Sequence, residues 1–273
     1  MKKTAKKVAK NALLILIAVI VFYPVYQMVI LSVLPREEIV SYIAAVENPA
    51  YRFAPGYFFP RAFSPEQIRA ALTPAFLRAF YISFVYTVLV VVLQFVVAFV
   101  SGFVFAKTTF KGRDILFFLY LAAMVLPFHV TVVPLNQILH RVNLFDTPWA
   151  VILPAVFSPL GVFLFRQFIQ QVPDEVLEAA TLDGAGLFCI LKNIVLPIIK
   201  GGAAMFFLLT MVMQWAAIEP ALAFIRAEDL RPVSLYLREL MNTETALIFA
   251  PSVLYMLPVI LAVILLVKPT ANS

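Results

Sequence analysis

The chain has 273 residues, of which 63% are hydrophobic and only 13% are charged. A soluble globular domain is about 45–50% apolar and about 25% charged. A globule of this size with so few polar groups could not cover its apolar surface, so the composition excludes an ordinary soluble enzyme and favours a membrane protein. The net charge of +6 is spread over an apolar background, which makes nucleic acid a poor partner.

Residue types that usually hold cofactors are scarce. The chain has one cysteine, Cys189, together with two histidines and eight glycines that are scattered along the sequence. A single cysteine excludes an internal disulfide and a cysteine-based metal site. Since no glycine-rich loop is placed to cradle a phosphate either, the sequence predicts no metal, no cofactor and no catalytic residues.

Six apolar stretches are long enough, or nearly so, to cross a hydrocarbon core of about 30 Å, which takes about 20 helical residues. They are 12–34, 80–106, 115–139, 149–165, 198–218 and 246–267. The first is too long for a secretory signal and no small-x-small cleavage site ends it, so it is expected to remain as a membrane helix. The sequence thus predicts an all-α polytopic membrane protein with six transmembrane helices.

The distribution of charge predicts that both ends of the chain lie in the cytoplasm. With this orientation, the inside segments hold 12 of the 21 basic residues and 5 of the 15 acidic residues. These segments are the head of the chain, 107–114, 166–200 and the tail. An excess of Lys and Arg in cytoplasmic segments is the recognised determinant of topology.

A long segment, 35–77, connects the first two stretches and is expected to lie outside. Within it, Ser64-Pro65-Glu66-Gln67 reads as a helix start, because Ser64 can cap, Pro65 fits a first turn and Gln67 can reach back. A short helix leading into the second span is therefore expected. It is either a connector resting on the lipid headgroups or a docking surface for an external partner.

The connection between the fourth and fifth stretches, Arg166 to Lys200, is longer than a simple turn requires. Pro173 suits a first helical turn, and the two acids that follow it lie where the helix dipole favours negative charge. Asp183-Gly184 is a turn signal, because glycine adopts positive φ without steric cost. A second amphipathic stretch runs from Leu187 to Val195, so the segment predicts helix, tight turn and helix at the cytoplasmic surface.

The order of residues in this segment resembles the EAA motif of binding-protein-dependent ABC importer permeases. In that family the pattern is E-A-A, three residues, G, about nine residues and then an apolar I-x-L-P. The chain has Glu178-Ala179-Ala180, then Gly184, then Ile194-Val195-Leu196-Pro197. Further segments resemble the carbohydrate-uptake branch that contains the maltose-type permeases: Phe110–Arg113, Val133–Leu135, Asn143–Thr147, and Ile152–Pro154 with Ser158-Pro159.

The resemblance runs from about residue 76 to 197 and more loosely to 267. It implies a single transmembrane domain over 1–273 with a permease core at 76–267, an N-terminal helix at 12–34, an external loop at 35–77 and a cytoplasmic coupling loop at 166–197. In the family this loop docks on a separate ATPase. The residues that the resemblance assigns to ATPase coupling are Glu178, Ala179, Ala180, Asp183, Gly184 and Pro197. The alternative is that Glu178 only solvates an interfacial helix.

The resemblance also implies partners and a location. They are a second, related permease subunit, a cytoplasmic ABC ATPase dimer and an external or periplasmic solute-binding protein, assembled at the bacterial inner membrane. The cargo of the carbohydrate branch is sugars or oligosaccharides. The chain itself has no G-x-x-x-x-G-K-[ST] motif and is expected not to be an enzyme.

Polar residues within the apolar stretches are candidates for the path of the cargo. They are Gln94, His129, Asn136, Gln137, Gln214 and Trp215. Ionisable groups in lipid are costly and often mark a pathway, and sugars need donors, acceptors and flat aromatic faces. The alternative is that each side chain bonds to a neighbouring helix or to a carbonyl that a proline has freed.

Two other functions fit a polytopic chain. A stand-alone channel or secondary carrier would transport without nucleotide, but no internal repeat of the kind found in carriers is visible. A membrane-embedded lipid or glycan enzyme would need acids clustered at one face. The acids that qualify are Glu219, Glu228, Asp229, Glu239 and Glu244, and they are interleaved with Arg226, Arg231 and Arg238, which would neutralise them.

Overall fold

The computed structural model describes residues 2–48, 56–60 and 62–270. All regular secondary structure in this part of the chain is helical. The chain divides into two compact units, one made of Met1–Arg78 with Tyr236–Leu257 and the other of Ala79–Leu235 with Pro258–Ser273.

The first unit is built on helices α1 (Lys2–Leu31), α2 (Arg36–Glu47) and α3 (Glu66–Ala71) and the short helix η3 (Thr245–Leu247). Its core consists of Leu31, Leu34 and Ile39, which are buried and which pack against aromatic side chains that include Tyr42, Tyr57 and Phe249. The unit contains the predicted external segment 35–77, of which residues 49–55 and 61 lie outside the described residues.

Helix α3 begins where the sequence predicts a helix start, and the amide of Glu66 donates a hydrogen bond of 3.3 Å to Ser64 Oγ. Helix α2 is not among the expected elements. It begins directly after Pro35. The negative charges of Glu37 and Glu38 lie in its first turn, where the positive end of the helix dipole stabilises them. In its described residues, the segment thus contains two short helices, α2 and α3, before the long helix that begins at Pro74.

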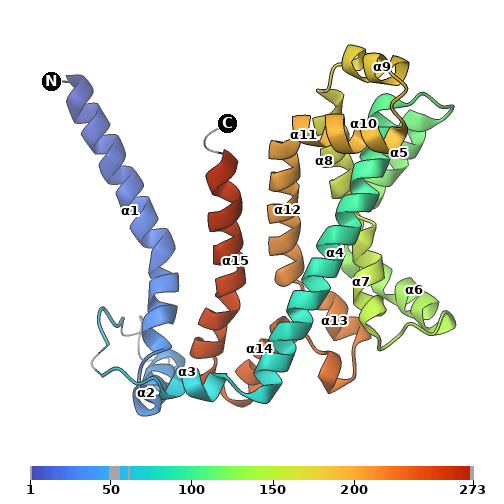
Figure 1. Ribbon diagram of the computed structural model, residues 1–273. Coiled ribbons are helices and arrows are strands. Elements are labelled where there is room, and N and C mark those ends of the chain that lie inside the picture. The colour runs from blue at the N-terminus through green and yellow to red at the C-terminus, as the bar shows by residue number, and fades with distance from the viewer. Residues whose placement is uncertain (1, 49–55, 61, 271–273) are drawn as a thin grey trace. The chain divides into compact units, whose positions relative to one another are not determined.

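The second unit carries most of the helices (Figure 1). They are α5 (Arg113–Ala123), α6 (Phe128–Arg141), α7 (Pro148–Val156), α8 (Pro159–Gln170), α9 (Asp174–Leu182), α10 (Leu187–Ile190), the π-helical turn η1 (Leu191–Val195), α11 (Leu196–Ile198), α12 (Lys200–Trp215), α13 (Glu219–Phe224) and the 3-10 turn η2 (Glu228–Leu230). Helices α4 (Pro74–Lys107), α14 (Val233–Thr243) and α15 (Phe249–Thr270) contribute residues to both units.

By length and composition, three helical segments could cross a membrane: Lys10–Leu31, Pro74–Lys107 and Pro148–Gln170. Two further segments pass the same test only as bent pairs, Arg113–Ala123 with Phe128–Arg141 and Leu187–Ile198 with Lys200–Trp215. The apolar helix Phe249–Leu265 is shorter.

The stretch 115–139 is therefore not one straight helix. Helices α5 and α6 meet at 101° across a break that ends at Pro127. A residue before proline is disfavoured in the helical region, and Pro127 itself has an extended backbone with ψ 141°, so the helix stops and restarts. Pro134, in contrast, lies inside α6.

The stretch 198–218 also begins with a bend. The chain turns by 85° between the helical segment that ends at Ile198 and α12, which then runs from Lys200 to Trp215. The stretch 149–165 consists of α7 and α8, which are separated by Phe157 and Ser158. Ser158 caps α8 by accepting a hydrogen bond of 3.2 Å from the amide of Gly161.

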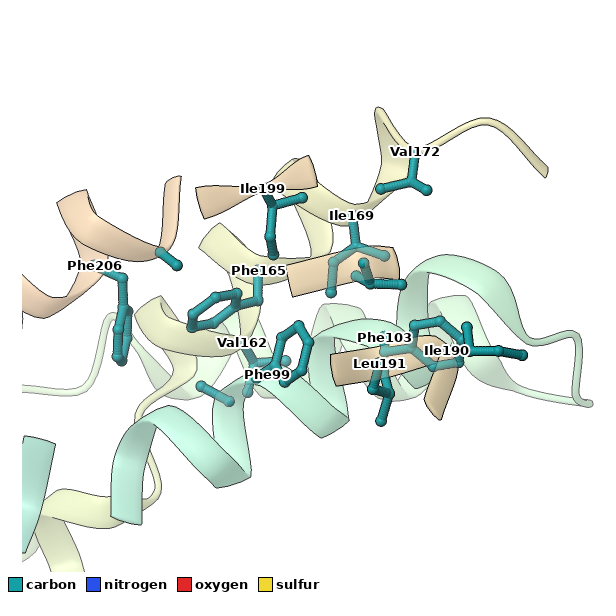
Figure 2. Close-up of a cluster of buried hydrophobic side chains, with 13 residues drawn as sticks. Phe99, Phe103, Val162, Phe165, Ile169, Val172, Ile190, Leu191, Ile199 and Phe206 are labelled. Carbon is teal, nitrogen blue, oxygen red and sulfur yellow. The ribbon is translucent and has the colours of Figure 1, made fainter. Parts of the chain in front are cut away.

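The largest core cluster joins α4, α8, α10, η1 and α12 (Figure 2). Phe165 and Ile169 of α8 are fully buried at its centre, and Phe99 of α4 and Phe206 of α12 pack against Phe165 with ring centroids 5.6 Å and 4.8 Å away. Helices α4 and α8 approach closely at Gly102, where an added Cβ would lie 2.6 Å from Phe165 Cβ. This cluster holds the membrane-length helices against the helix–turn–helix segment.

Candidate functional site

The segment after α8 folds as the helix, turn and helix that the sequence predicts. Pro173 has an extended backbone and precedes α9 rather than forming its first turn. Asp174 and Glu175 occupy that turn, where negative charge is favourable. The far end of α9 closes at Gly184, whose φ of +81° few other residues adopt.

The end of α9 is a Schellman motif. The amide of Ala185 donates to the carbonyl of Ala180 at 2.9 Å, and the amide of Gly184 donates to that of Thr181 at 3.0 Å. These two bonds satisfy carbonyls at the helix end and fix the direction in which the chain leaves. Gly184 therefore sets the angle between α9 and the helices that follow.

Helix α9 is attached to the core by few side chains. No residue of α9 is buried, and only Leu177 and Ala180 are half-buried against the large cluster. Glu178 and Ala179 are exposed, and Leu182 is 88% exposed. The outer face of α9 thus offers apolar surface beside a carboxylate, and a shallow hollow of about 370 Å³ is lined by Leu177, Glu178, Thr181 and Leu182.

The second half of the segment is bound more firmly. Ile190, Leu191 and Val195 are buried in the large cluster (Figure 2). The helix passes through the π-helical turn η1 before α11, where Pro197 has no N–H with which to continue the backbone ladder. Leu187 and Phe188 remain exposed at its start.

Two of the six candidate path residues come together. Gln94 of α4 and Gln214 of α12 line one cavity of about 190 Å³, along with Ser158 and Thr210. Gln94 is only 5% exposed, and its Oε1 has no hydrogen-bond partner among the described residues. The cavity lies at the break between α7 and α8 and is lined by polar groups from three elements.

A second cavity of about 580 Å³ shares Ala155, Met213 and Gln214 with the first. Its other lining residues include Phe128, Thr131, Leu135, Pro154, Glu219 and Phe224. Glu219 is the one charged residue that lines either of these two cavities within the described part of the chain. The two volumes therefore adjoin at Gln214.

The other four candidates do not line these cavities. His129 and Gln137 are exposed on α6, and Asn136 is half-buried there. Trp215 is buried and packs edge-on against Phe80, with ring centroids 5.2 Å apart. Conversely, sequence reasoning did not select Ser158 or Thr210. The Ser158-Pro159 pair, a cap followed by a first-turn proline, was a signal for the break at which Ser158 meets the cavity.

The loop between α6 and α7 is hydrogen-bonded to the end of α13, which lines the larger cavity. Asp146 has a positive φ of 57°, and its Oδ1 accepts hydrogen bonds from the amides of Arg226 at 2.7 Å and Ala227 at 3.0 Å. Its own amide donates to the carbonyl of Phe224 at 3.1 Å. These bonds fix the end of α13, and Phe224 lines the cavity.

The bonds to Asp146 also set its acidity. The amide of Ala227 and then that of Arg226 stabilise the charged carboxylate, so the pKa of Asp146 is lowered from its usual value of 3.8. Because the pKa of Asp146 is lower in the folded state than in the unfolded state, the charged carboxylate stabilises the fold at pH values above its unfolded-state pKa. This stabilisation is lost as the pH falls through the folded-state pKa.

We predict that Asp146→Asn, which keeps the shape but removes the charge, lowers the stability of the purified protein at pH 7 by roughly 1 kcal/mol, a modest value because the carboxylate is partly solvated. The difference in melting temperature from wild type should shrink as the pH falls below 3.8. Asp229→Asn, at an exposed position of the same region, is the control and should change little. A difference between Asp146→Asn and wild type that does not depend on pH would contradict this account.

Comparison with known proteins shows one family. Residues 98–268, which include the whole of α8 to α14, match the family described as "Binding-protein-dependent transport system inner membrane component". The match covers more than half of the chain.

Individual relatives align with part of this chain. The arabinooligosaccharides transport system permease protein AraQ of Halalkalibacterium halodurans is 31% identical over 155 residues, which are 56% of this chain and 56% of that protein. The sn-glycerol-3-phosphate transport system permease protein UgpE of Yersinia enterocolitica is 38% identical over 106 residues, 39% of this chain and 38% of that protein. The alignments thus span about half, or less, of the relatives' own length.

A solved structure shares the fold over almost the whole chain. It is a bacterial ABC transporter involved in the import of the acidic polysaccharide alginate, and it aligns over 98% of this chain and 97% of that chain. The TM-score is 0.81 and the sequence identity is 20%.

Proposed function

The chain belongs to the family of binding-protein-dependent transport system inner membrane components, and we propose that it is a permease subunit of an ATP-driven ABC importer whose cargo is a neutral sugar or oligosaccharide. As such a component it is a transport protein and not an enzyme. The observation that carries the proposal is the family match over 98–268, because this range contains α9, the larger cavity and every residue that lines the smaller cavity except Gln94.

In the proposed topology the chain crosses the membrane six times and both ends are cytoplasmic. The crossings are the three long segments, the bent pair of α5 and α6, helix α12 and Phe249–Leu265. Support for the orientation comes from the lysines at the head of the chain and from the excess of basic residues in the segments assigned to the cytoplasm. Segment 166–197 then faces the cytoplasm, and 1–273 forms one transmembrane domain.

We assign α9 as the coupling helix. The exposure of Glu178 and Ala179, the absence of buried residues from α9 and the fixed turn at Gly184 support this role, because a partner can reach the helix without displacing the core. The other coupling positions that the proposal keeps are Ala180, Asp183 and Pro197. The proposed partners are a cytoplasmic ATPase dimer, a second related permease subunit and a periplasmic solute-binding protein.

The two cavities form the proposed cargo path through this subunit. They are lined by amides and hydroxyls that include Gln94, Ser158, Thr210 and Gln214, groups that can exchange hydrogen bonds with a sugar. No basic side chain lines either cavity in the described residues, and the acid Glu219 disfavours an anion. The lining therefore favours neutral cargo, as in the arabinooligosaccharide system, over a phosphate ester or an acidic polysaccharide. His129, Asn136, Gln137 and Trp215 remain candidates only for contact outside these cavities.

Replacing Gln94 tests whether this residue contacts cargo or only packs between helices. Because Gln94 Oε1 has no partner among the described residues, we predict that Gln94→Leu leaves the melting temperature unchanged or raises it, while the uptake rate falls by about tenfold. Met213→Leu, a volume-conserving change in the lining of both cavities, is the control and should retain uptake. A lower melting temperature with normal uptake in Gln94→Leu would instead identify this residue as interhelical packing.

Two substitutions test coupling in cells that express the complete transport system. Glu178→Lys reverses the exposed charge of α9, and Gly184→Asp strains a backbone held at φ +81°. We predict that each lowers uptake at least about tenfold without reducing the amount of chain in the membrane. Glu175→Lys makes the same charge change on α9 outside the motif and should leave uptake nearly normal. Normal uptake in both motif variants would contradict the assignment, and ATP-independent uptake by the subunit alone would support a carrier.

The single cysteine gives a direct test of orientation. Cys189 is exposed on α10, in the segment assigned to the cytoplasm. We predict that a membrane-impermeant maleimide labels it only after the inner membrane is permeabilised. In a Cys189→Ser background, Glu228→Cys places an exposed thiol in the segment assigned to the outside, and this thiol should react without permeabilisation. The reverse pattern would invert the proposed topology.

A further inference from the structure

The last residue of α4 reaches across to the beginning of α9. Lys107 Nζ donates hydrogen bonds to the carbonyl oxygen of Val172 at 2.5 Å and to Asp174 Oδ1 at 2.6 Å. The Lys107 side chain is only 9% exposed, and Val172 is fully buried, whereas the Asp174 side chain is 72% exposed. One ammonium group therefore holds both the residue before Pro173 and the first residue of α9.

This contact matters because α9 has little else to hold it. The chain turns at Pro173 before α9 and at Gly184 after it, and only Leu177 and Ala180 pack against the core. Apolar contacts of two half-buried side chains resist sliding weakly, because such packing is not directional. A charge-assisted hydrogen bond has a defined length and direction.

A second cation stabilises the same end of α4. Arg166 Nε donates to the carbonyl of Phe105 at 3.3 Å, and the guanidinium carbon lies 4.1 Å from the centre of the Phe117 ring. Lys107 and Arg166 thus place two positive charges near the C-terminal end of α4, where the helix dipole favours cations. Arg166 links α8 and α5 to α4, but of the two cations only Lys107 contacts α9.

We infer that Lys107 is the positioning residue of the coupling helix: it transmits displacement of α9 to α4, the 34-residue helix that carries Gln94. The inference rests on the proposed role of α9. When the ATPase moves α9, the ammonium carries the start of α9 and the end of α4 together. Without the ammonium group, α9 could pivot at Pro173 and Gly184 without displacing the end of α4.

Three variants of the assembled importer, with its ATPase and partner permease, test this role. Lys107→Met keeps the apolar stem but removes the donors, and we expect uptake per ATP hydrolysed to fall by about tenfold while ATP hydrolysis continues. Lys107→Arg keeps a charged donor and should restore most of the coupling. Lys111→Met removes a neighbouring exposed lysine and should have no effect.

A spin label provides a readout that does not depend on transport. A label at Val176→Cys, in a Cys189→Ser background, reports on α9 directly, since Val176 is 41% exposed. Its mobility should rise in Lys107→Met and return with Lys107→Arg. If the importer with Lys107→Met does not assemble, Asp174→Asn replaces it, because this variant weakens the same contact at an exposed position. Uptake per ATP hydrolysed should then fall by about threefold.

The outcomes separate the two proposals. If Glu178→Lys and Gly184→Asp both leave uptake normal, α9 is not a coupling helix and the inference about Lys107 is overturned with it. If Gly184→Asp abolishes uptake but Lys107→Met keeps normal uptake per ATP, the coupling role stands and the inference about Lys107 is overturned. A parallel loss of uptake and ATP hydrolysis in Lys107→Met, with an unchanged label mobility, also overturns it.

Discussion

Lipid cannot supply hydrogen bonds, and this constraint governs where the chain can interrupt its helices. Each break must satisfy its freed backbone groups within the protein. Ser158 does so at the start of α8, and outside the proposed membrane region the Schellman motif at Gly184 satisfies the end of α9 in the same way. The polar cavity and α9, the proposed coupling helix, are both found beside such interruptions. Irregular backbone therefore marks the parts of the molecule that are available for function.

Helix α8 connects these two functional regions. Its first turn, with Ser158 and Gly161, lines the smaller cavity. Its second half, with Phe165 and Ile169, is buried in the cluster shown in Figure 2, and the chain continues from there into α9. A short helix whose inner face is packed in a core transmits displacement as a rigid element, because close-packed cores deform little. The cavity and α9 are thus mechanically related through α8 as well as through α4.

Local chemistry in the sequence was enough to predict several elements. Prolines, acids in a first turn and a glycine at a helix end predicted α9 and its turn, and Ser64 predicted the start of α3. The cavities were harder to predict because they depend on which faces of α4, α7 and α12 meet. A helix that is apolar on all sides gives no periodic signal of its inward face. Of the predicted candidates, Gln94 and Gln214 line one cavity, whereas His129 and Gln137 are exposed on α6. Helix α2 was missed because its segment is not markedly apolar.

The π-helical turn η1 lies in the second half of the segment that connects α8 to α12. In an α-helix, side chains five positions apart diverge by about 140° around the axis. A π turn accommodates one extra residue, so Ile190 and Val195 both enter the same cluster despite that separation. Deleting one residue from this turn would place Ile190 and Val195 four positions apart in an α-helix, where they would still share a face. The extra residue therefore changes which backbone groups pair in this turn, while the apolar side chains on either side of it face the same cluster.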